Sequence, residues 1–254
     1  MRRAWKLIVL GVLAYVAFLA ASVPAGLALS PLQQQLPVEF AGIDGTFWNG
    51  RARSVAWDGQ ALGGLEWRLH PAGLITGSLP ADVRLSGPLV NGEGRVAAGL
   101  GGSLEARETR LRVSPALVQQ LGALPVEIGG DFFLRLETLH LAEGVLPTVT
   151  GEVIWREARL TAPFAATLGD YRLALETREN GIHGTITDQG GPFRTSGNLL
   201  VRPDGQYQLT LRLVPDANTP ADLRDGLKFL GRPDARGAVT LRQQGRLSGL
   251  LGSR

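Results

Sequence analysis

Residues 64–70 read Gly-Leu-Glu-Trp-Arg-Leu-His, and their pattern indicates the class of the fold. Leu65, Trp67 and Leu69 occupy every second position, whereas the residues between them are charged. Because successive side chains of a β-strand point to opposite faces, this alternation predicts a strand with one apolar and one solvated face. One-sided strands of this kind are typical of antiparallel sheets.

The same alternation recurs in residues 207–213, where a tyrosine and three leucines at every second position lie between polar residues. Turn-forming residues separate such segments. Pro203-Asp204-Gly205 precedes this strand, and Asn180-Gly181 is the dipeptide best suited to a type I′ hairpin. The sequence therefore predicts a mainly β domain built around an antiparallel sheet.

Two short helices are expected to interrupt the strands. Ser114-Pro115-Ala116-Leu117 offers an N-cap serine with proline at the first helical position, and Gly122 is placed to end that helix. Thr219-Pro220-Ala221-Asp222 repeats the arrangement with a capping-box acid, and its helix is expected to end at Gly231. A strand-like run follows each helix, at Phe132–Leu141 and Ala238–Leu241.

The chain matches itself at an offset of about 105 residues, which predicts an internal duplication. Trp48 aligns with Trp155, and Pro115-Ala116 aligns with Pro220-Ala221. Glycines keep a similar register, at Gly63 and Gly169 and at Gly87 and Gly191. We therefore expect two tandem repeats, each with several strands and one short helix. The expected boundaries are residues 38–142 and 143–247 for the repeats and 248–254 for a C-terminal tail.

An uncharged stretch at the N-terminus predicts a membrane anchor. Residues 7–29 contain no charged residue, and Arg2, Arg3 and Lys6 precede them. A helix of this stretch is about 34 Å long, enough to cross a hydrocarbon core of about 30 Å. Because basic residues stay preferentially on the cytoplasmic side, the β domain is expected in the periplasm of a bacterial-type inner membrane. The expected boundaries are residues 1–6 for the cytoplasmic N-terminus, 7–29 for the transmembrane helix and 30–37 for a tether.

A cleaved signal peptide is the alternative, because Gly26-Leu27-Ala28 resembles the small-x-small pattern of a cleavage site. The apolar region of a signal peptide is typically about 7–15 residues long. The stretch here is longer, so its length favours a retained anchor.

The charge balance argues against nucleic acid as a partner. The chain has 26 Lys and Arg against 23 Asp and Glu. Three of the basic residues precede the apolar stretch, so the remaining 23 equal the acidic residues and the exported part is formally neutral. The basic excess therefore belongs to the topology signal. The absence of cysteine from the chain excludes disulfides, thiol nucleophiles and thiolate metal sites.

Motifs for catalysis or metal binding are weak. His70, His140 and His183 lie far apart, and none resembles part of a zinc site. Residues 92–97 match a G-x-G-x-x-A dinucleotide pattern, but the glycine-rich residues 99–103 that follow cannot begin a stable helix. We therefore expect no catalytic residue, no cofactor and no metal, and we do not expect an enzyme.

Large aromatic residues lie between Gly45 and Gly50, just after the expected tether. Glycine at both ends indicates a backbone that needs positive φ or close approach. In one interpretation Trp48 packs in the core beside a turn. In the other, the segment binds a partner, since exposed tryptophan and arginine are the usual hot-spot residues of interfaces. The candidate partner-binding residues are Phe47, Trp48, Asn49 and Arg51.

Three segments, taken in order after a basic N-terminus and one membrane helix, resemble the type II secretion system protein N family. They are Gly45-Thr46-Phe47-Trp48-Asn49-Gly50-Arg51-Ala52, Leu65-Glu66-Trp67-Arg68-Leu69-His70-Pro71 and Leu227-Lys228-Phe229-Leu230-Gly231-Arg232-Pro233. The resemblance covers essentially the whole chain. It implies an accessory inner-membrane component of the type II secretion machinery. Such a component acts in assembly or gating, through contacts with other inner-membrane or periplasmic subunits or with the secretin. The resemblance carries over no catalytic residue.

A lipid-binding or lipid-transfer module is the alternative function. One-sided strands can curl into an apolar groove, and the duplicated β unit resembles AsmA-like and bridge-type lipid carriers in outline. A closed core is the simpler interpretation, because monomers rarely expose large apolar patches. The residues that line such a groove or fill such a core are Leu65, Trp67, Leu69, Tyr171, Leu173 and Leu175.

Overall fold

The computed structural model describes residues 22–26, 38–57, 59–99, 101–122, 127–142, 147–162, 165–216 and 219–246. The chain divides into two compact units, Met1–Glu93 (unit 1) and Gly94–Arg254 (unit 2). Within each unit, strands that follow one another in the sequence pair antiparallel. The prediction of a mainly β, antiparallel fold is therefore confirmed.

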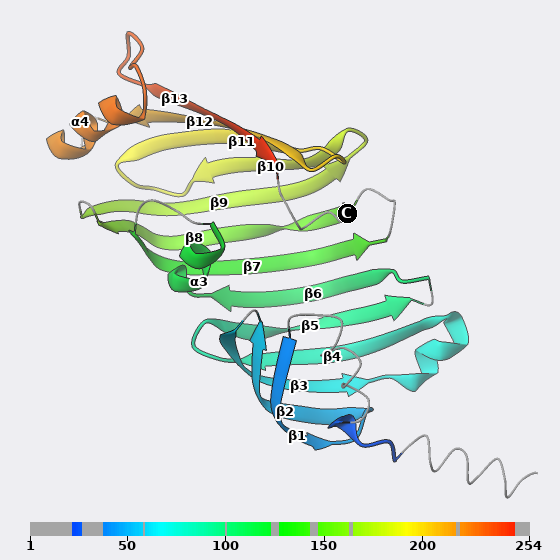
Figure 1. The fold of residues 1–254 in the computed structure, drawn as a ribbon. Helices are drawn as coiled ribbons and strands as arrows, with labels where there is room; N and C mark the ends of the chain where they lie inside the picture. Colours follow the sequence, from blue (N-terminus) through cyan, green and yellow to red (C-terminus); the bar gives the residue numbers. More distant parts are fainter. Residues whose placement is uncertain are drawn as a thin grey trace, which may run out of the picture. The chain divides into compact units, whose positions relative to one another are not determined.

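Unit 1 is an antiparallel sheet whose strands lie in chain order (Figure 1). Strand β5 (Val90–Gly99) begins in this unit and ends in the next. The other elements of unit 1 are β1 (Val38–Gly45), β2 (Asn49–Trp57), β3 (Gln60–Leu69), the 3-10 helix η1 (Pro71–Thr76) and β4 (Ser78–Ser86).

Strand β3 contains the alternating stretch from which the fold class was predicted. Leu65, Trp67 and Leu69 are half-buried on one face, whereas Glu66 and Arg68 are exposed on the other. Across the pairing with β4, the three apolar side chains meet Leu85, Val83 and Ala81. The alternation therefore marks a one-sided strand, as expected.

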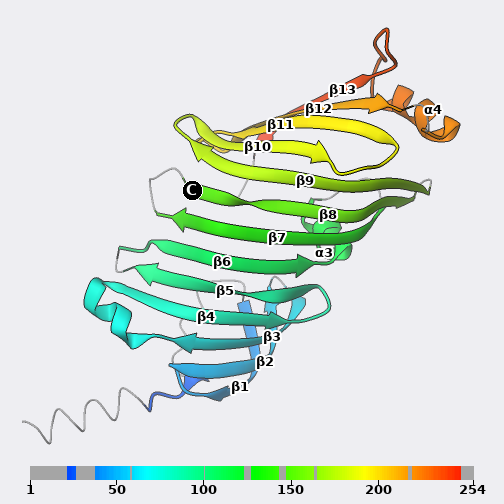
Figure 2. The same ribbon diagram turned by 180° about the vertical axis from the view of Figure 1, so that it is seen from behind.

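Unit 2 continues the same antiparallel pattern from β6 to β13 (Figure 2). The predicted hairpin turns at Asn180-Gly181 and Pro203-Asp204-Gly205 join β9 to β10 and β11 to β12. The elements are β6 (Leu104–Val113), α3 (Pro115–Gly122), β7 (Glu127–Leu141), β8 (Thr148–Ala162), β9 (Ala166–Arg178), β10 (Gly181–Asp188), β11 (Phe193–Val201), β12 (Gln206–Pro215), α4 (Ala221–Leu230) and β13 (Val239–Arg246).

Both predicted helices are present, but their first residues are held differently. The backbone N–H of Leu117 donates to Oγ of Ser114 at 3.4 Å, so the serine caps α3 as expected. The expectation that Thr219 caps α4 is wrong. Its hydroxyl donates to the carbonyl oxygen of Pro192 and accepts from the N–H of Asp216 at 2.7 Å. Thr219 therefore ties the loop before α4 to a distant strand end instead of capping the helix.

A small hydrophobic core lies where α4 covers the last strands of unit 2. Phe193, Leu213, Leu227 and Val239 form this cluster, and Val239 is fully buried. Leu227 comes from the helix and the other three from β11, β12 and β13. The amphipathic helix thus closes one end of the apolar sheet face.

Residues 22–26 lie against the turn between β1 and β2. The backbone N–H of Phe47 donates to the carbonyl oxygen of Val23 at 2.8 Å, and Pro24 forms an isolated β-bridge with Thr46. Ala25 is only 1% exposed. These residues therefore belong to the folded part of unit 1.

The rest of the predicted anchor lies outside the described residues, as do Arg2, Arg3, Lys6 and the tether 30–37. Among the residues that the structure describes, no helix is long and apolar enough to span a bilayer. The transmembrane helix at residues 7–29 stays a prediction.

Two glycine pairs have the same close approach in both units. A Cβ on Gly63 would lie 2.4 Å from the Cα of Gly87, and one on Gly169 would lie 2.7 Å from the Cα of Gly191. Gly63 and Gly169 also both have positive φ, at 124° and 90°. Neither position therefore accommodates a side chain.

The two tryptophans used to align the repeats occupy different positions. Trp48 lies in the turn between β1 and β2, whereas Trp155 lies within β8. The boundary between the compact units, after Glu93, also differs from the expected repeat boundary after residue 142. The tandem repeat stays a prediction, for which the glycine pairs are the supporting observation.

Candidate functional site

The predicted partner-binding residues lie in and beside the tight turn between β1 and β2. The N–H of Thr46 donates to the carbonyl oxygen of Asn49 at 3.0 Å. The N–H of Asn49 donates in return to Oγ1 of Thr46 at 3.2 Å. The threonine thus closes the turn with both its backbone and its side chain, as is typical of threonine in loops.

The glycines on either side of this turn have the two roles that the sequence predicted. Gly45 has a φ of 91°, a conformation that disfavours side chains. A Cβ on Gly50 would lie 2.4 Å from Cζ2 of Trp67, so the indole ring packs directly on the backbone of β2. The expectation of positive φ or close approach is therefore confirmed.

The backbone of the aromatic pair is hydrogen-bonded to strand β3. Nε1 of Trp67 donates to the carbonyl oxygen of Phe47 at 2.9 Å. The N–H of Leu69 donates to the carbonyl oxygen of Trp48 at 2.7 Å. The rings of Phe47 and Trp48 meet edge to face, with centroids 5.1 Å apart. Both side chains are half-buried, so they belong neither to a closed core nor fully to the surface.

Asn49 and Arg51 are exposed beside the aromatic pair. Nε of Arg51 lies 3.7 Å from Oδ2 of Asp44 across the hairpin. An exposed pair of this kind contributes little stability, so the guanidinium is available to a partner at small cost. The turn therefore presents one amide and one guanidinium on a backbone held in place by several hydrogen bonds.

The residues predicted to line a groove or a core all lie on apolar sheet faces. In unit 1, Leu65, Trp67 and Leu69 are half-buried, as described above. In unit 2, the half-buried side chains of β9 pair with apolar or small residues of β8. The pairs are Tyr171 with Trp155, Leu173 with Val153 and Leu175 with Gly151.

An aromatic row crosses the apolar face of unit 2. Trp155 of β8 stacks on Phe132 of β7, with ring centroids 5.1 Å apart. Toward β9, the ring centroids of Trp155 and Tyr171 are 5.9 Å apart. Burial in this row raises the pKa of the Tyr171 hydroxyl above its ordinary value. The middle of this sheet face is therefore apolar and partly desolvated.

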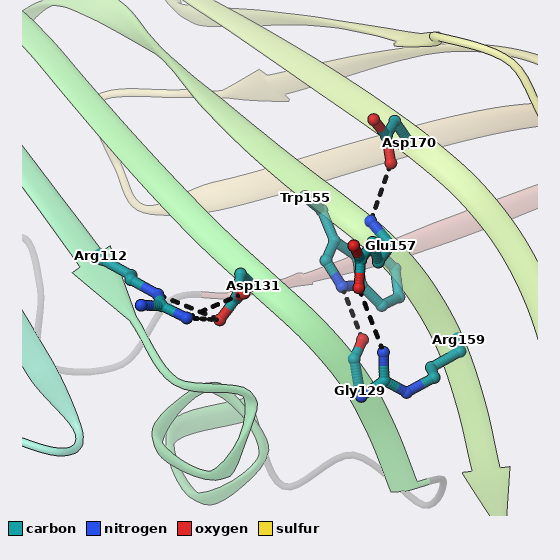
Figure 3. A network of polar contacts seen from close by, with 7 residues as sticks. All are labelled: Arg112, Gly129, Asp131, Trp155, Glu157, Arg159 and Asp170. Carbon is teal, nitrogen blue, oxygen red and sulfur yellow. Dashed lines mark hydrogen bonds and ion pairs between the residues drawn. The ribbon is translucent and has the colours of Figure 1, made fainter.

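A bulge in β8 holds Trp155 on that face (Figure 3). Nε1 of Trp155 donates to the carbonyl oxygen of Gly129 at 3.0 Å. Two residues further on, Glu157 has a φ of 49°, and its N–H donates to Oδ1 of Asp170 at 2.8 Å. A non-glycine residue rarely adopts this conformation, and the hydrogen bond that Asp170 accepts stabilises it here.

The opposite face of unit 2 is polar and hollowed. Oε2 of Glu152 lies 2.7 Å from Nε of Arg172, and Oε1 of Glu152 lies 3.4 Å from Nη1 of Arg135. One carboxylate therefore bridges two guanidinium groups. Around it lies a cavity of about 620 Å³. Its charged lining residues are Glu108, Arg110, Arg135, Glu137, Glu152, Arg172, Glu176 and Arg178, so positive and negative groups are equal in number. The alternation of polar residues predicted this face but not the hollow, because residues from five strands that are distant in the sequence line it.

The histidines remain apart in the structure. Nε2 of His70 lies 2.8 Å from Oδ2 of Asp82, and Nε2 of His183 lies 2.6 Å from Oδ1 of Asn180. Within the described parts of the chain, no three His, Asp or Glu residues are grouped to bind a metal ion. These contacts stabilise strand ends and turns.

The family model for type II secretion system (T2SS), protein N, matches residues 36–242 of this chain. A type II secretion system protein N from Vibrio cholerae serotype O1 is 32% identical over 234 residues, which are 88% of this chain and 91% of the relative. Proteins of the same name from Aeromonas hydrophila and Klebsiella pneumoniae are 28% and 29% identical. They cover 92% and 91% of this chain and 95% and 91% of the relatives. No solved structure is significantly similar to the chain.

Proposed function

Because the chain belongs to the type II secretion system protein N family, we propose that it is an accessory inner-membrane component of the type II secretion machinery. Its periplasmic β domain acts through contacts with other subunits during assembly or gating. The match over residues 36–242 carries the assignment to the machinery, because it includes nearly all of the β domain. The partners belong to the inner membrane, the periplasm or the outer-membrane secretin.

The proposed topology keeps the N-terminal segment attached to the β domain. Cleavage after Ala28 would remove Val23 and Ala25, which are bonded to or buried against unit 1. Retention as an anchor preserves those contacts. The basic N-terminus then stays in the cytoplasm.

The proposed contact surface consists of Phe47, Trp48, Asn49 and Arg51. The observation that supports it is a turn with fixed backbone and exposed polar side chains. Its backbone is bonded to Val23 and β3, while Asn49 and Arg51 remain in solvent. A surface fixed in this way loses little conformational entropy on binding, which favours recognition.

Site-specific photo-crosslinking in intact cells tests this surface. A photo-reactive residue at position 49 is expected to form an adduct with another secretion subunit, identified by mass spectrometry. The same residue at position 60, which is exposed at the opposite end of β3, is the matched control. Equal adduct yields at the two positions, or no secretion subunit in the adducts, would refute the proposed surface.

A lipid-binding role is the second candidate, and one observation favours it. The apolar face of unit 2 leaves Leu173 and Leu175 half-buried, so their side chains remain partly accessible to a ligand. Mass spectrometry of the detergent-purified protein is expected to detect bound phospholipid if this face is a groove. A lipid-free protein would eliminate this candidate and leave the secretion role intact.

A further inference from the structure

Two aliphatic side chains protrude from unit 1 at the tip of η1. Ile75 is 90% exposed and Leu74 is 48% exposed. Residues 71–81, around this tip, contain no charged side chain. Exposed aliphatic area is unfavourable in water, so an apolar partner that covers these two adjacent side chains would be favoured.

The tip is held away from the sheet by its own backbone. Gly77 has a φ of 78°, and its N–H donates to the carbonyl oxygens of Gly73 and Leu74. A Cβ on Gly73 would lie 2.3 Å from Cδ of Pro80, so the loop packs tightly at its base. These contacts keep Leu74 and Ile75 in solvent instead of letting them fold onto the sheet.

Hydrogen bonds also fasten the two ends of the loop to each other. The N–H of His70 donates to the carbonyl oxygen of Pro80 at 2.8 Å. The ring of His70 also contacts Asp82, in the middle of β4, with Nε2 2.8 Å from Oδ2. The loop is therefore a rigid projection from the end of the β3 and β4 hairpin.

This projection and residues 22–26 lie at the same end of unit 1. The N–H of Leu69, just before the loop, donates to the carbonyl oxygen of Trp48. The neighbouring Phe47 is bonded to Val23. In both views of the ribbon, η1 and residues 22–26 lie on the same side of the strands of unit 1 (Figures 1 and 2).

We propose that Leu74 and Ile75 insert into the outer leaflet of the membrane that the N-terminal segment crosses. This inference rests on the proposed topology, in which the N-terminal segment crosses the membrane and residues 22–26 lie near its outer surface. A stable protein interface buries about 800 Å² on each partner, which is more than two side chains provide. A lipid surface therefore suits this tip better than a protein partner does. Insertion to a depth of about 5–10 Å is typical of interfacial apolar groups. The loop and the anchor together would fix the orientation of unit 1 on the membrane.

The absence of cysteine from the chain permits a direct test with single labelled positions. The full-length protein carrying Ile75→Cys is labelled with a polarity-sensitive fluorophore and reconstituted in phospholipid vesicles that contain spin-labelled lipid. Gln60→Cys, labelled in the same way, is the control at the opposite end of β3. We expect severalfold stronger quenching by spin-labelled lipid at position 75 than at position 60, and severalfold weaker quenching by aqueous iodide.

Equal accessibility of the two positions to iodide would overturn the insertion. Flotation of the full-length protein with vesicles tests the anchor separately. A protein that floats while position 75 remains in water keeps the topology and loses the insertion, whereas a protein that does not float loses both. In native inner-membrane vesicles, shielding of position 75 from iodide without quenching by spin-labelled lipid would indicate a protein occupant and would also overturn the proposal.

Discussion

Gly50→Ala is expected to destabilise unit 1 by displacing the indole that supports the β1–β2 turn. The added Cβ would lie 2.4 Å from Cζ2 of Trp67 and 2.9 Å from the carbonyl oxygen of Thr46. Overpacking of this kind costs about 1–3 kcal/mol, and loss of the Trp67 hydrogen bond to Phe47 costs about 0.5–1.5 kcal/mol more. Replacing glycine by alanine within a strand stabilises the folded state by about 0.5–1 kcal/mol. The net destabilisation is therefore about 2 kcal/mol when the midpoint of each range is used.

Gly64→Ala on the neighbouring strand is the matched control. Its Cβ would meet its nearest neighbour, the carbonyl oxygen of Arg53, at 3.5 Å, which is ordinary contact. This variant is expected to be neutral or about 0.5 kcal/mol more stable. Urea unfolding of the detergent-purified full-length protein, followed by tryptophan fluorescence, measures both changes, because Trp48, Trp57 and Trp67 all lie in unit 1. An unfolding midpoint for Gly50→Ala equal to that of Gly64→Ala would refute the role assigned to the Trp67 contact.

Further predictions concern unit 2. Asp170→Ala removes the acceptor for the N–H of Glu157 and is expected to destabilise the protein by about 1 kcal/mol. Glu157→Gly removes the side chain from a residue with positive φ and is expected to stabilise the protein by about 1 kcal/mol. Urea unfolding measures both changes. Burial raises the pKa of Tyr171, so stability is expected to fall as pH rises above 10, the ordinary value, and Tyr171→Phe is expected to reduce this loss in thermal unfolding at alkaline pH. The hydrogen bond from Arg212, followed by two backbone N–H groups, lowers the pKa of Asp234. The stabilising effect of this carboxylate is therefore expected above pH 3.8 and is lost as pH falls through the lower folded pKa. A chemical-shift titration that gives Asp234 the ordinary pKa of an aspartate would contradict this lowering. Hydrogen exchange in the loop before β13 is expected to be faster in Asp234→Asn than in the wild-type protein.

Local patterns in the sequence predicted the strands and turns because their causes are local. The alternation around Trp67 reflects side-chain direction along one strand, and Asn180-Gly181 forms a hairpin through its own backbone preferences. Ser114 capped α3 as expected because an N-cap bond joins residues three apart. These features need no knowledge of the rest of the chain.

Features that depend on distant residues could not be predicted in this way. Thr219 has the sequence position of an N-cap residue, but its hydroxyl donates a hydrogen bond to the carbonyl oxygen of Pro192, 27 residues away. Trp48 and Trp155 match in the sequence and differ in the structure, because one lies in a turn and the other beside a bulge. The exposure of Ile75 likewise follows from the loop contacts and not from its own residue type.

The candidate contact surface was predicted in part. The sequence identified the glycines around the turn and the backbone requirements that they meet. The hydrogen bond from the Phe47 N–H to the Val23 carbonyl oxygen could not be predicted, because it joins segments 24 residues apart and leaves no periodic signal. That bond is what links the expected membrane anchor to the proposed surface.

Secretion by cells that lack this protein shows whether the β1–β2 turn acts in the secretion machinery. The measurement is the fraction of a type II secretion substrate that reaches the medium in a deletion strain complemented with variants of the gene. We expect the wild-type protein and Gln60→Ala to restore secretion, and Asn49→Ala combined with Arg51→Ala to restore much less at equal protein level. Secretion that is unchanged by the deletion, or restored fully by the double variant, would contradict an accessory component that acts through the β1–β2 turn.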